Sequence, residues 1–132
     1  MDATRTFMTL SWISLPTVMY GGYSLRHLME RGDGLTPFQE TYFRAGHAHA
    51  GVLLILSLPY YRALERSGLS ARARWAGGGL YLGGVLAQSG GFFLHLAVGK
   101  PGQRSAGTTV TTAGALALAA SSLFAAYASM RG

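Results

Sequence analysis

Residues 75–99 read WAGGGLYLGGVLAQSGGFFLHLAVG, and this stretch decides the fold class of the chain. It contains one histidine, His95, and no aspartate, glutamate, lysine or arginine. A bilayer core about 30 Å thick is crossed by about 20 mostly apolar residues in helical conformation. The stretch therefore predicts a transmembrane helix over residues 75–99.

Three further stretches are about as long and nearly as free of charge. Residues 6–25 and 105–130 contain no formally charged side chain, and residues 42–61 contain only Arg44 and two histidines. Because four spans take up most of the 132 residues, we predict a single transmembrane domain over residues 1–132. Short polar connections place sequential helices antiparallel, so the sequence predicts an all-α integral membrane four-helix bundle of up-down-up-down topology. The connections are expected at residues 26–40, 62–74 and 100–104.

The first stretch could also be a cleavable signal peptide, which has a basic start followed by a short apolar run. Residues 1–5 read MDATR, so one acidic residue offsets one arginine. The apolar run of residues 6–25 is also longer than the apolar region of a usual signal peptide. We therefore predict that this stretch stays in the protein as a helix, in which Pro16 can introduce a kink.

The composition supports a membrane protein and excludes several classes of site. Hydrophobic residues make up 49% of the chain and charged residues 12%, whereas a soluble domain carries about a quarter charged residues. The chain has no cysteine, which excludes a disulfide scaffold, a thiolate metal site and an iron–sulfur protein. The formal net charge of +6 does not indicate a nucleic-acid partner, because the charges lie between long apolar runs. Anionic lipid headgroups are the expected partner of these charges.

The distribution of basic residues predicts the orientation in the cell membrane. One end of the bundle would hold both termini and residues 62–74, with six basic residues against five at the other end. Four of the six are arginines within residues 62–74, and such a density is typical of a cytoplasmic loop. We therefore expect a multi-pass membrane protein with both termini in the cytoplasm.

Four histidines are the side chains that point to a function, namely His27, His47, His49 and His95. Ionisable groups at membrane depth are costly and mark functional sites. The predicted topology brings all four to the end of the bundle opposite the termini. His47 and His49 lie about 200° apart around a regular helix, so they cannot both face the same point. Glycine and alanine flank these two, and a pair of glycines precedes His95, which leaves the rings accessible to a ligand.

Two kinds of cofactor suit such histidines. Imidazoles from facing helices, flanked by glycine and aromatic residues, are the ligands that a b-type haem needs, and here His47 or His49 would pair with His95. Neutral imidazole also binds zinc or copper, and all four histidines could then act together. Carboxylates in the adjacent segment could assist them, namely Glu30, Asp33 and Glu40.

The segment FRAGHAHAGVLL at residues 43–54 resembles the His-x-His segment of small stand-alone four-span membrane proteins that are grouped with subunit I of the heme–copper oxidases. In that group a histidine in a similar setting ligates a haem. The resemblance implies a haem or metal site in which His47 or His49 forms the axial pair with His95. His27 would then be a supporting or metal-linked group. The group often continues its segment with Leu-Asn-Leu, where residues 50–52 here are Ala-Gly-Val. The chain also lacks the further spans of an oxidase, so oxygen reduction and proton pumping are not implied.

A third interpretation makes the protein a non-catalytic accessory subunit of a membrane complex. Glycine lets helices approach closely in lipid, so glycine-rich faces could dock into a larger assembly while the histidines only bond neighbouring helices. A chain of 132 residues has a limited interior, so a haem could also lie between the two copies of a homodimer. The sequence contains no Gly-x-Ser-x-Gly, phosphate-binding loop or His-Glu-x-x-His motif, and it does not decide whether the protein is an enzyme.

Overall fold

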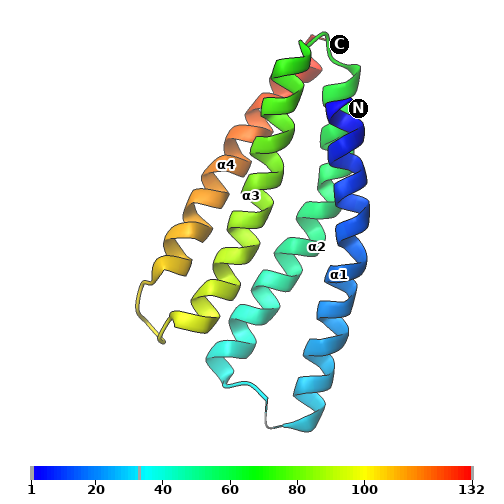
Figure 1. Ribbon diagram of the computed structural model, residues 1–132. Coiled ribbons are helices and arrows are strands. Elements are labelled where there is room, and N and C mark those ends of the chain that lie inside the picture. Colours follow the sequence, from blue (N-terminus) through cyan, green and yellow to red (C-terminus); the bar gives the residue numbers. More distant parts are fainter. Residues whose placement is uncertain (1, 33, 132) are drawn as a thin grey trace.

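The computed structural model describes residues 2–32 and 34–131, and these residues form four helices and no strand. The chain runs along α1, returns along α2, and repeats this path with α3 and α4, so that both termini lie at one end (Figure 1). The predicted all-α fold with antiparallel sequential helices is therefore confirmed. The helices are α1 (Ala3–Arg31), α2 (Pro37–Arg66), α3 (Ala71–Val98) and α4 (Ala106–Ser129).

The helices extend beyond the predicted apolar spans, so two predicted connections were too long. The segment predicted at residues 26–40 shrinks to residues 32–36, and the one predicted at 62–74 shrinks to 67–70. Polar residues continue the helices because they pair along the helix surface, as Arg62 does with Glu65 at 3.0 Å. A charged side chain that lies outside the apolar core of a membrane stays hydrated. The helix can therefore continue past it, and charge alone does not end a helix.

Local capping residues set the helix ends. Thr36 accepts a hydrogen bond from the backbone of Gln39, whose side chain binds back to the Thr36 N–H, and Pro37 occupies the first position of α2. α1 ends at Gly32, whose φ of 72° is accessible to glycine at little cost. At the other end of α1, a hydrogen bond from the Thr4 hydroxyl lowers the pKa of Asp2, so this carboxylate stays charged next to the positive end of the helix dipole.

Two prolines lie inside helices without ending them. α1 continues as one helix through Pro16, and α2 continues through Pro59. Proline removes one backbone hydrogen-bond donor, but in both cases the remaining backbone keeps its helical conformation. The predicted effect of Pro16 is therefore at most a bend within a continuous helix.

α3 and α4 pack with their backbones in close approach. Small buried residues repeat every seventh position on both helices, which keeps each stripe facing the partner helix. A Cβ atom added to Gly114 would lie 2.2 Å from the backbone nitrogen of Gln88, so only glycine fits there. Together these residues form the small-residue stripe, namely Gly77, Gly84 and Gly91 on α3, and Gly107, Gly114, Ser121 and Ala128 on α4.

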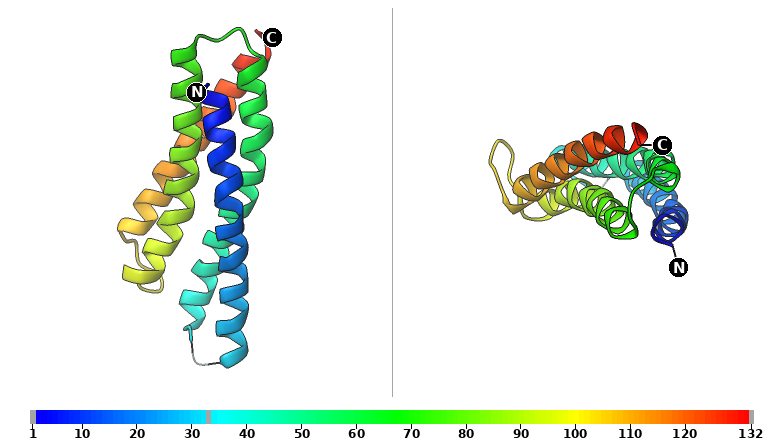
Figure 2. Two further views of the ribbon diagram at one scale, coloured as in Figure 1. Left: turned by 45° about the vertical axis from the view of Figure 1, so that its right-hand side comes forward. Right: turned by 90° about the horizontal axis from the view of Figure 1, so that it is seen from above.

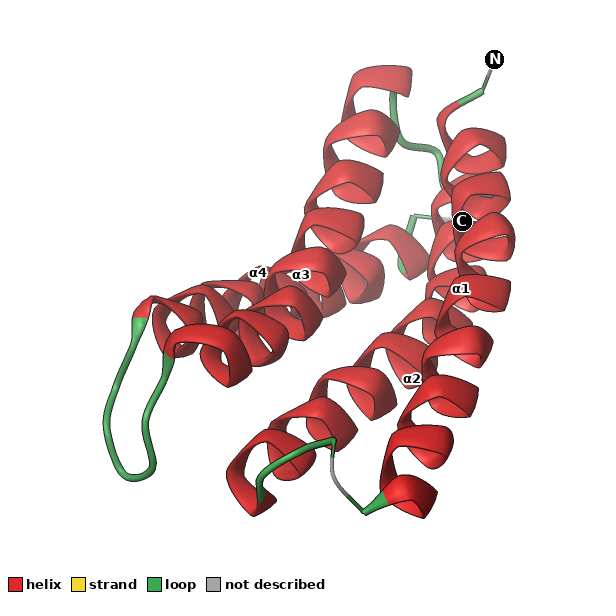
Figure 3. Ribbon diagram, turned by 60° about the horizontal axis from the view of Figure 1, so that its bottom comes forward, coloured by secondary structure: helices red, strands yellow, loops and turns green. Residues whose placement is uncertain are grey.

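The best-packed part of the interior lies toward the end that holds the termini. Phe7 of α1 stacks on Tyr61 at 5.5 Å between ring centroids and meets Trp75 of α3 edge-on at 5.3 Å. α1 does not contact α4 anywhere in the described ranges. Away from the termini, the α1–α2 pair diverges from the α3–α4 pair (Figures 2 and 3). Aromatic side chains nevertheless join α2 to α3 at that end, as Phe43 does with Phe93 at 5.4 Å between ring centroids.

Two of the helices, α3 and α4, are long and apolar enough to cross a membrane. Within the described residues, α1 and α2 do not reach the same mean hydropathy. In α2, Arg44, His47 and His49 lower the mean hydropathy. The structure therefore supports two candidate membrane spans.

Candidate functional site: the histidine end

Two of the four histidines, His27 and His95, lie near helix ends, and their side chains differ greatly in burial. His27 is exposed near the end of α1, where its ring stacks on Tyr23 with the planes 5° apart. His95 is buried near the end of α3, with 2% of its surface exposed. His47 and His49 lie deeper in α2, about 15 to 18 Å from its first residue at 1.5 Å per residue. The antiparallel topology places all four toward the end opposite the termini, as predicted.

His95 is enclosed by groups from three helices. Its Nδ1 lies 2.7 Å from the hydroxyl of Ser105, which also caps α4 by accepting a hydrogen bond from the Gly107 N–H. The ring meets Tyr42 and Phe38 of α2 edge-on, with centroids 4.3 and 5.3 Å away. His95 therefore ties the end of α3 to the start of α4 and to the first turns of α2.

His49 has one ring nitrogen committed to its own helix. Nδ1 lies 2.7 Å from the carbonyl oxygen of Ala45, which can only accept, so Nδ1 carries the proton and Nε2 is the acceptor. The ring lies 4.8 Å from that of Phe92 on α3. It borders a shallow groove of about 190 Å³ between Ala48 and Leu53.

His47 packs against the paired glycines of α1. A Cβ atom added to Gly22 would lie 2.9 Å from its Nε2, so the glycine makes room for the ring. His47 also borders a groove of about 530 Å³ between α1 and α2. Among the residues that the structure describes, neither ring nitrogen of His47 has a hydrogen-bond partner. The groove is lined by Gly22, Leu25, Arg26, Met29, Glu30, Arg44 and His47.

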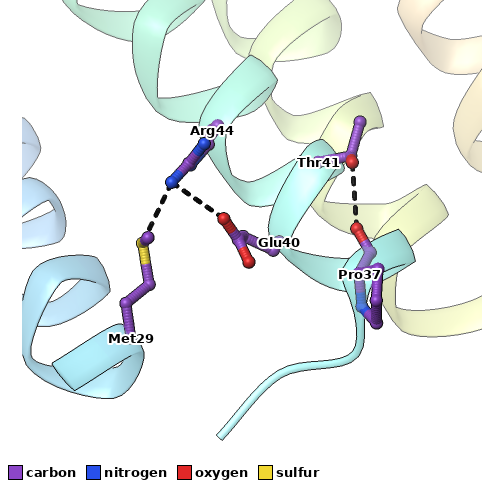
Figure 4. Close-up of polar contacts among 5 residues, drawn as sticks. All are labelled: Met29, Pro37, Glu40, Thr41 and Arg44. Atoms are coloured by element: carbon purple, nitrogen blue, oxygen red, sulfur yellow. Dashed lines mark hydrogen bonds and ion pairs between the residues drawn. The ribbon is translucent and has the colours of Figure 1, made fainter. Parts of the chain in front are cut away.

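Two arginines line the groove beside His47, and each is paired with a glutamate of its own helix. The Nη2 atom of Arg44 lies 2.8 Å from Glu40 and donates to the Met29 sulfur at 3.4 Å, which joins α2 to α1 (Figure 4). Arg26 pairs with Glu30 at 2.7 Å and is largely exposed. Each guanidinium has five N–H donors, so both keep donors free for an anionic group.

The predicted divergence of His47 and His49 is confirmed. His47 contacts α1, whereas His49 contacts Phe92 of α3. The structure does not bring His47 and His95 to a common space, because His95 is surrounded by Tyr42, Phe38 and Ser105.

The described residues do not assemble the four histidines into a metal centre. In residues 2–32 and 34–131 no group of three or more histidines, aspartates and glutamates lies close enough to hold a metal ion. Asp33, which we named as an assisting carboxylate together with Glu30 and Glu40, lies outside the described residues. Glu30 and Glu40 each pair with an arginine of their own helix instead.

Sequence reasoning named His47 and Glu30 but missed the other residues of the groove beside His47. Arg26 and Arg44 were counted only for the orientation of the helices, although arginines near a membrane-depth histidine were a usable signal. The role of Met29 could not be predicted from neighbouring residues in the sequence, because its contact with Arg44 joins two different helices. Ser105 was likewise hidden, since its bond to His95 depends on how α4 returns along α3.

Comparison with known proteins leaves the identity of the chain open. No protein-family model, no curated protein and no solved structure matches it. The resemblance of residues 43–54 to the four-span proteins grouped with heme–copper oxidase subunit I stays a prediction based on those residues.

Proposed function

We propose that this protein is an integral membrane protein that crosses the bilayer four times. Large apolar side chains are exposed on all four helices, including α1 and α2, and such a surface is unusual for a soluble monomer. Only 33% of the most apolar part of α3 and 17% of that of α4 is buried within the chain, so neither resembles the core helix of a soluble protein. The exposed side chains include Trp12, Ile13, Met19, Val52, Ile55, Leu56, Leu86, Val98, Leu116 and Leu123.

Site-specific labelling tests this topology, because the chain has no native cysteine. We expect Glu30→Cys and Gln103→Cys to react with a membrane-impermeant maleimide added to intact cells. Ala71→Cys and Met130→Cys should react only after permeabilisation, since arginine-rich loops stay cytoplasmic. Reversal of both pairs would contradict the orientation. Equal labelling of all four positions from one side would contradict the four spans.

We further propose that the protein binds a b-type haem in the groove beside His47 and serves a redox or sensory role. The observation that carries this proposal is that His47 borders the groove together with two arginines and has no hydrogen-bond partner among the described residues. A volume of about 530 Å³ falls in the usual range of cofactor sites, about 300–1,000 Å³. A histidine nitrogen is a common axial ligand of haem iron.

Four side chains of the groove have roles in this proposal. His47 would supply a ring nitrogen to the iron. Met29 lines the same groove, and its thioether is another group that binds haem iron in proteins. Arg26 and Arg44 would hold the anionic propionates through charge-assisted hydrogen bonds. The groove is open on one side, so lipid or a second copy of the chain would cover the haem edge. When bound, a haem supplies one-electron chemistry.

A pair of variants within the His-x-His segment tests the haem proposal. Protein purified in detergent from haem-sufficient cells should show a Soret band and about one iron per chain or per dimer. We expect His47→Ala to abolish the band and the matched control His49→Ala to retain it, because only His47 borders the groove beside the arginines. A colourless, iron-free wild-type preparation would overturn the proposal. Zinc or copper found without porphyrin absorbance would favour a metal-binding protein instead.

A second candidate function is that of an accessory subunit in a membrane complex. It is favoured by the outward face of α3, where a Cβ atom added to Gly83 would have no neighbour within 4 Å. Glycines that face lipid allow a helix of another subunit to approach closely. A protein that is free of haem and metal, and keeps its cellular role when all four histidines are replaced by glutamine, would support this candidate.

A further inference from the structure

We propose that a second groove, between α1 and α3, binds a lipid-dissolved molecule with a planar carbonyl-bearing head of the quinone class, hydrogen-bonded by Ser89. This groove is distinct from the one beside His47, and the two share no lining residue. The inference rests on the proposed membrane placement but not on the proposed haem. A colourless protein could still bind such a ligand.

The groove arises because α1 leaves α3 after their contact near the termini. Phe7 fills the space above Gly78, where an added Cβ would lie 2.3 Å from the ring, and beyond this point the two helices separate. Ala50 and Leu54 of α2 lie between them, and the volume is about 330 Å³. Apart from serine and threonine hydroxyls, the lining is apolar. The remaining lining residues are Ser14, Thr17, Val18, Leu82, Val85, Leu86, Ser89, Gly90 and Phe93.

Ser89 is the polar group that points to a ligand. Its side chain is 6% exposed, and its hydroxyl has no hydrogen-bond partner among the described residues. Several other helical serines bond a carbonyl of the preceding turn, as Ser14 does at 2.8 Å and Ser122 at 2.9 Å. An unpaired buried hydroxyl is costly, so a donor in this position favours a ligand that supplies an acceptor.

The depth of Ser89 selects the chemistry of that ligand. Ser89 lies nine positions before Val98, and α3 is about 42 Å long, so a hydrocarbon core about 30 Å thick centred on this helix places Ser89 about 8 Å inside its boundary. The ester carbonyls of phospholipids lie at the boundary of the hydrocarbon core, so they do not reach this depth. The acceptor must therefore belong to a molecule dissolved in the core. Phe93, which is 37% exposed, offers an aromatic surface for a planar head.

Native mass spectrometry of the protein in phosphatidylcholine nanodiscs tests the proposal, with decylubiquinone as the probe and decylbenzene as the probe without a carbonyl. We expect saturable binding of decylubiquinone and at least about 3-fold weaker binding of decylbenzene. Ser89→Ala should weaken decylubiquinone binding by about 3- to 10-fold, because one hydrogen bond is lost. Ser122→Ala, whose hydroxyl bonds a carbonyl on α4, is the matched control and should bind like the wild type.

Two glycine variants test the location of the site without disturbing the packing. An added Cβ meets no atom within 4 Å at either Gly90 or Gly83, but only Gly90 lines the groove. We expect Gly90→Val to weaken decylubiquinone binding by more than about 10-fold through lost space, and Gly83→Val to leave it within about twofold. Equal effects of the two variants, no saturable binding, or equal affinity for decylbenzene would overturn the proposal, the last result indicating a groove for acyl chains only.

Discussion

The Gly114→Val variant is expected to separate α3 from α4 and to lower the unfolding temperature of the detergent-solubilised protein by about 10 °C or more. A Cβ atom at this position would lie 2.2 Å from the backbone nitrogen of Gln88 and 2.7 Å from its Cα. Backbone atoms cannot move aside by a change of rotamer, so the helices themselves must separate. Separation would also expose the neighbouring positions of the small-residue stripe, because the two helices share one continuous contact.

Circular dichroism during heating measures this effect, and Gly83→Val is the matched control. Both substitutions put the same side chain into the middle of a helix, so they share the intrinsic cost of valine. At Gly83 an added Cβ meets no atom within 4 Å, so this variant should unfold within a few degrees of the wild type. Unfolding of both variants at the same temperature would contradict a direct backbone contact between α3 and α4.

Phe7→Ala is expected to release α1 from the other helices and to cost about 2–3 kcal/mol of unfolding free energy. Phe7 is 7% exposed and fills the space between Tyr61, Trp75 and the glycine at position 78. Removing the ring leaves a cavity whose lining loses its dispersion contacts. In the proposed membrane placement the cost should lie below that for phenylalanine in water-soluble cores, because lipid is itself apolar.

Hydrogen exchange of the α1 amides measures the release, with Trp12→Ala as the control. Trp12 lies on the same helix but is 58% exposed, so its removal leaves no internal cavity. We expect faster exchange along α1 in the Phe7 variant only, while α4 keeps its protection because α1 does not contact α4 among the described residues. Equal exchange in the two variants would show that α1 is held mainly by α2.

Much of the fold could be predicted from local features of the sequence. Long runs without formal charge predicted helices, and short connections predicted their antiparallel order, which the structure confirms. The helix ends were predicted less well, because Arg26, Glu30 and Arg62 looked like loop residues but continue the helices through pairs along the helix surface. Charge marks where a membrane core ends, whereas backbone hydrogen bonding and capping mark where a helix ends.

The candidate site shows the same division between local and long-range information. The sequence by itself determined that the four histidines lie toward one end and that His47 and His49 face different directions, because helix geometry depends only on spacing along the chain. Only the tertiary structure decided which groups surround each histidine. Ser105 reaches His95 because α4 returns along α3, and Gly22 accommodates His47 because α1 lies beside α2. Such contacts depend on the distances between helices, which are set by side-chain volume at positions far apart in the chain.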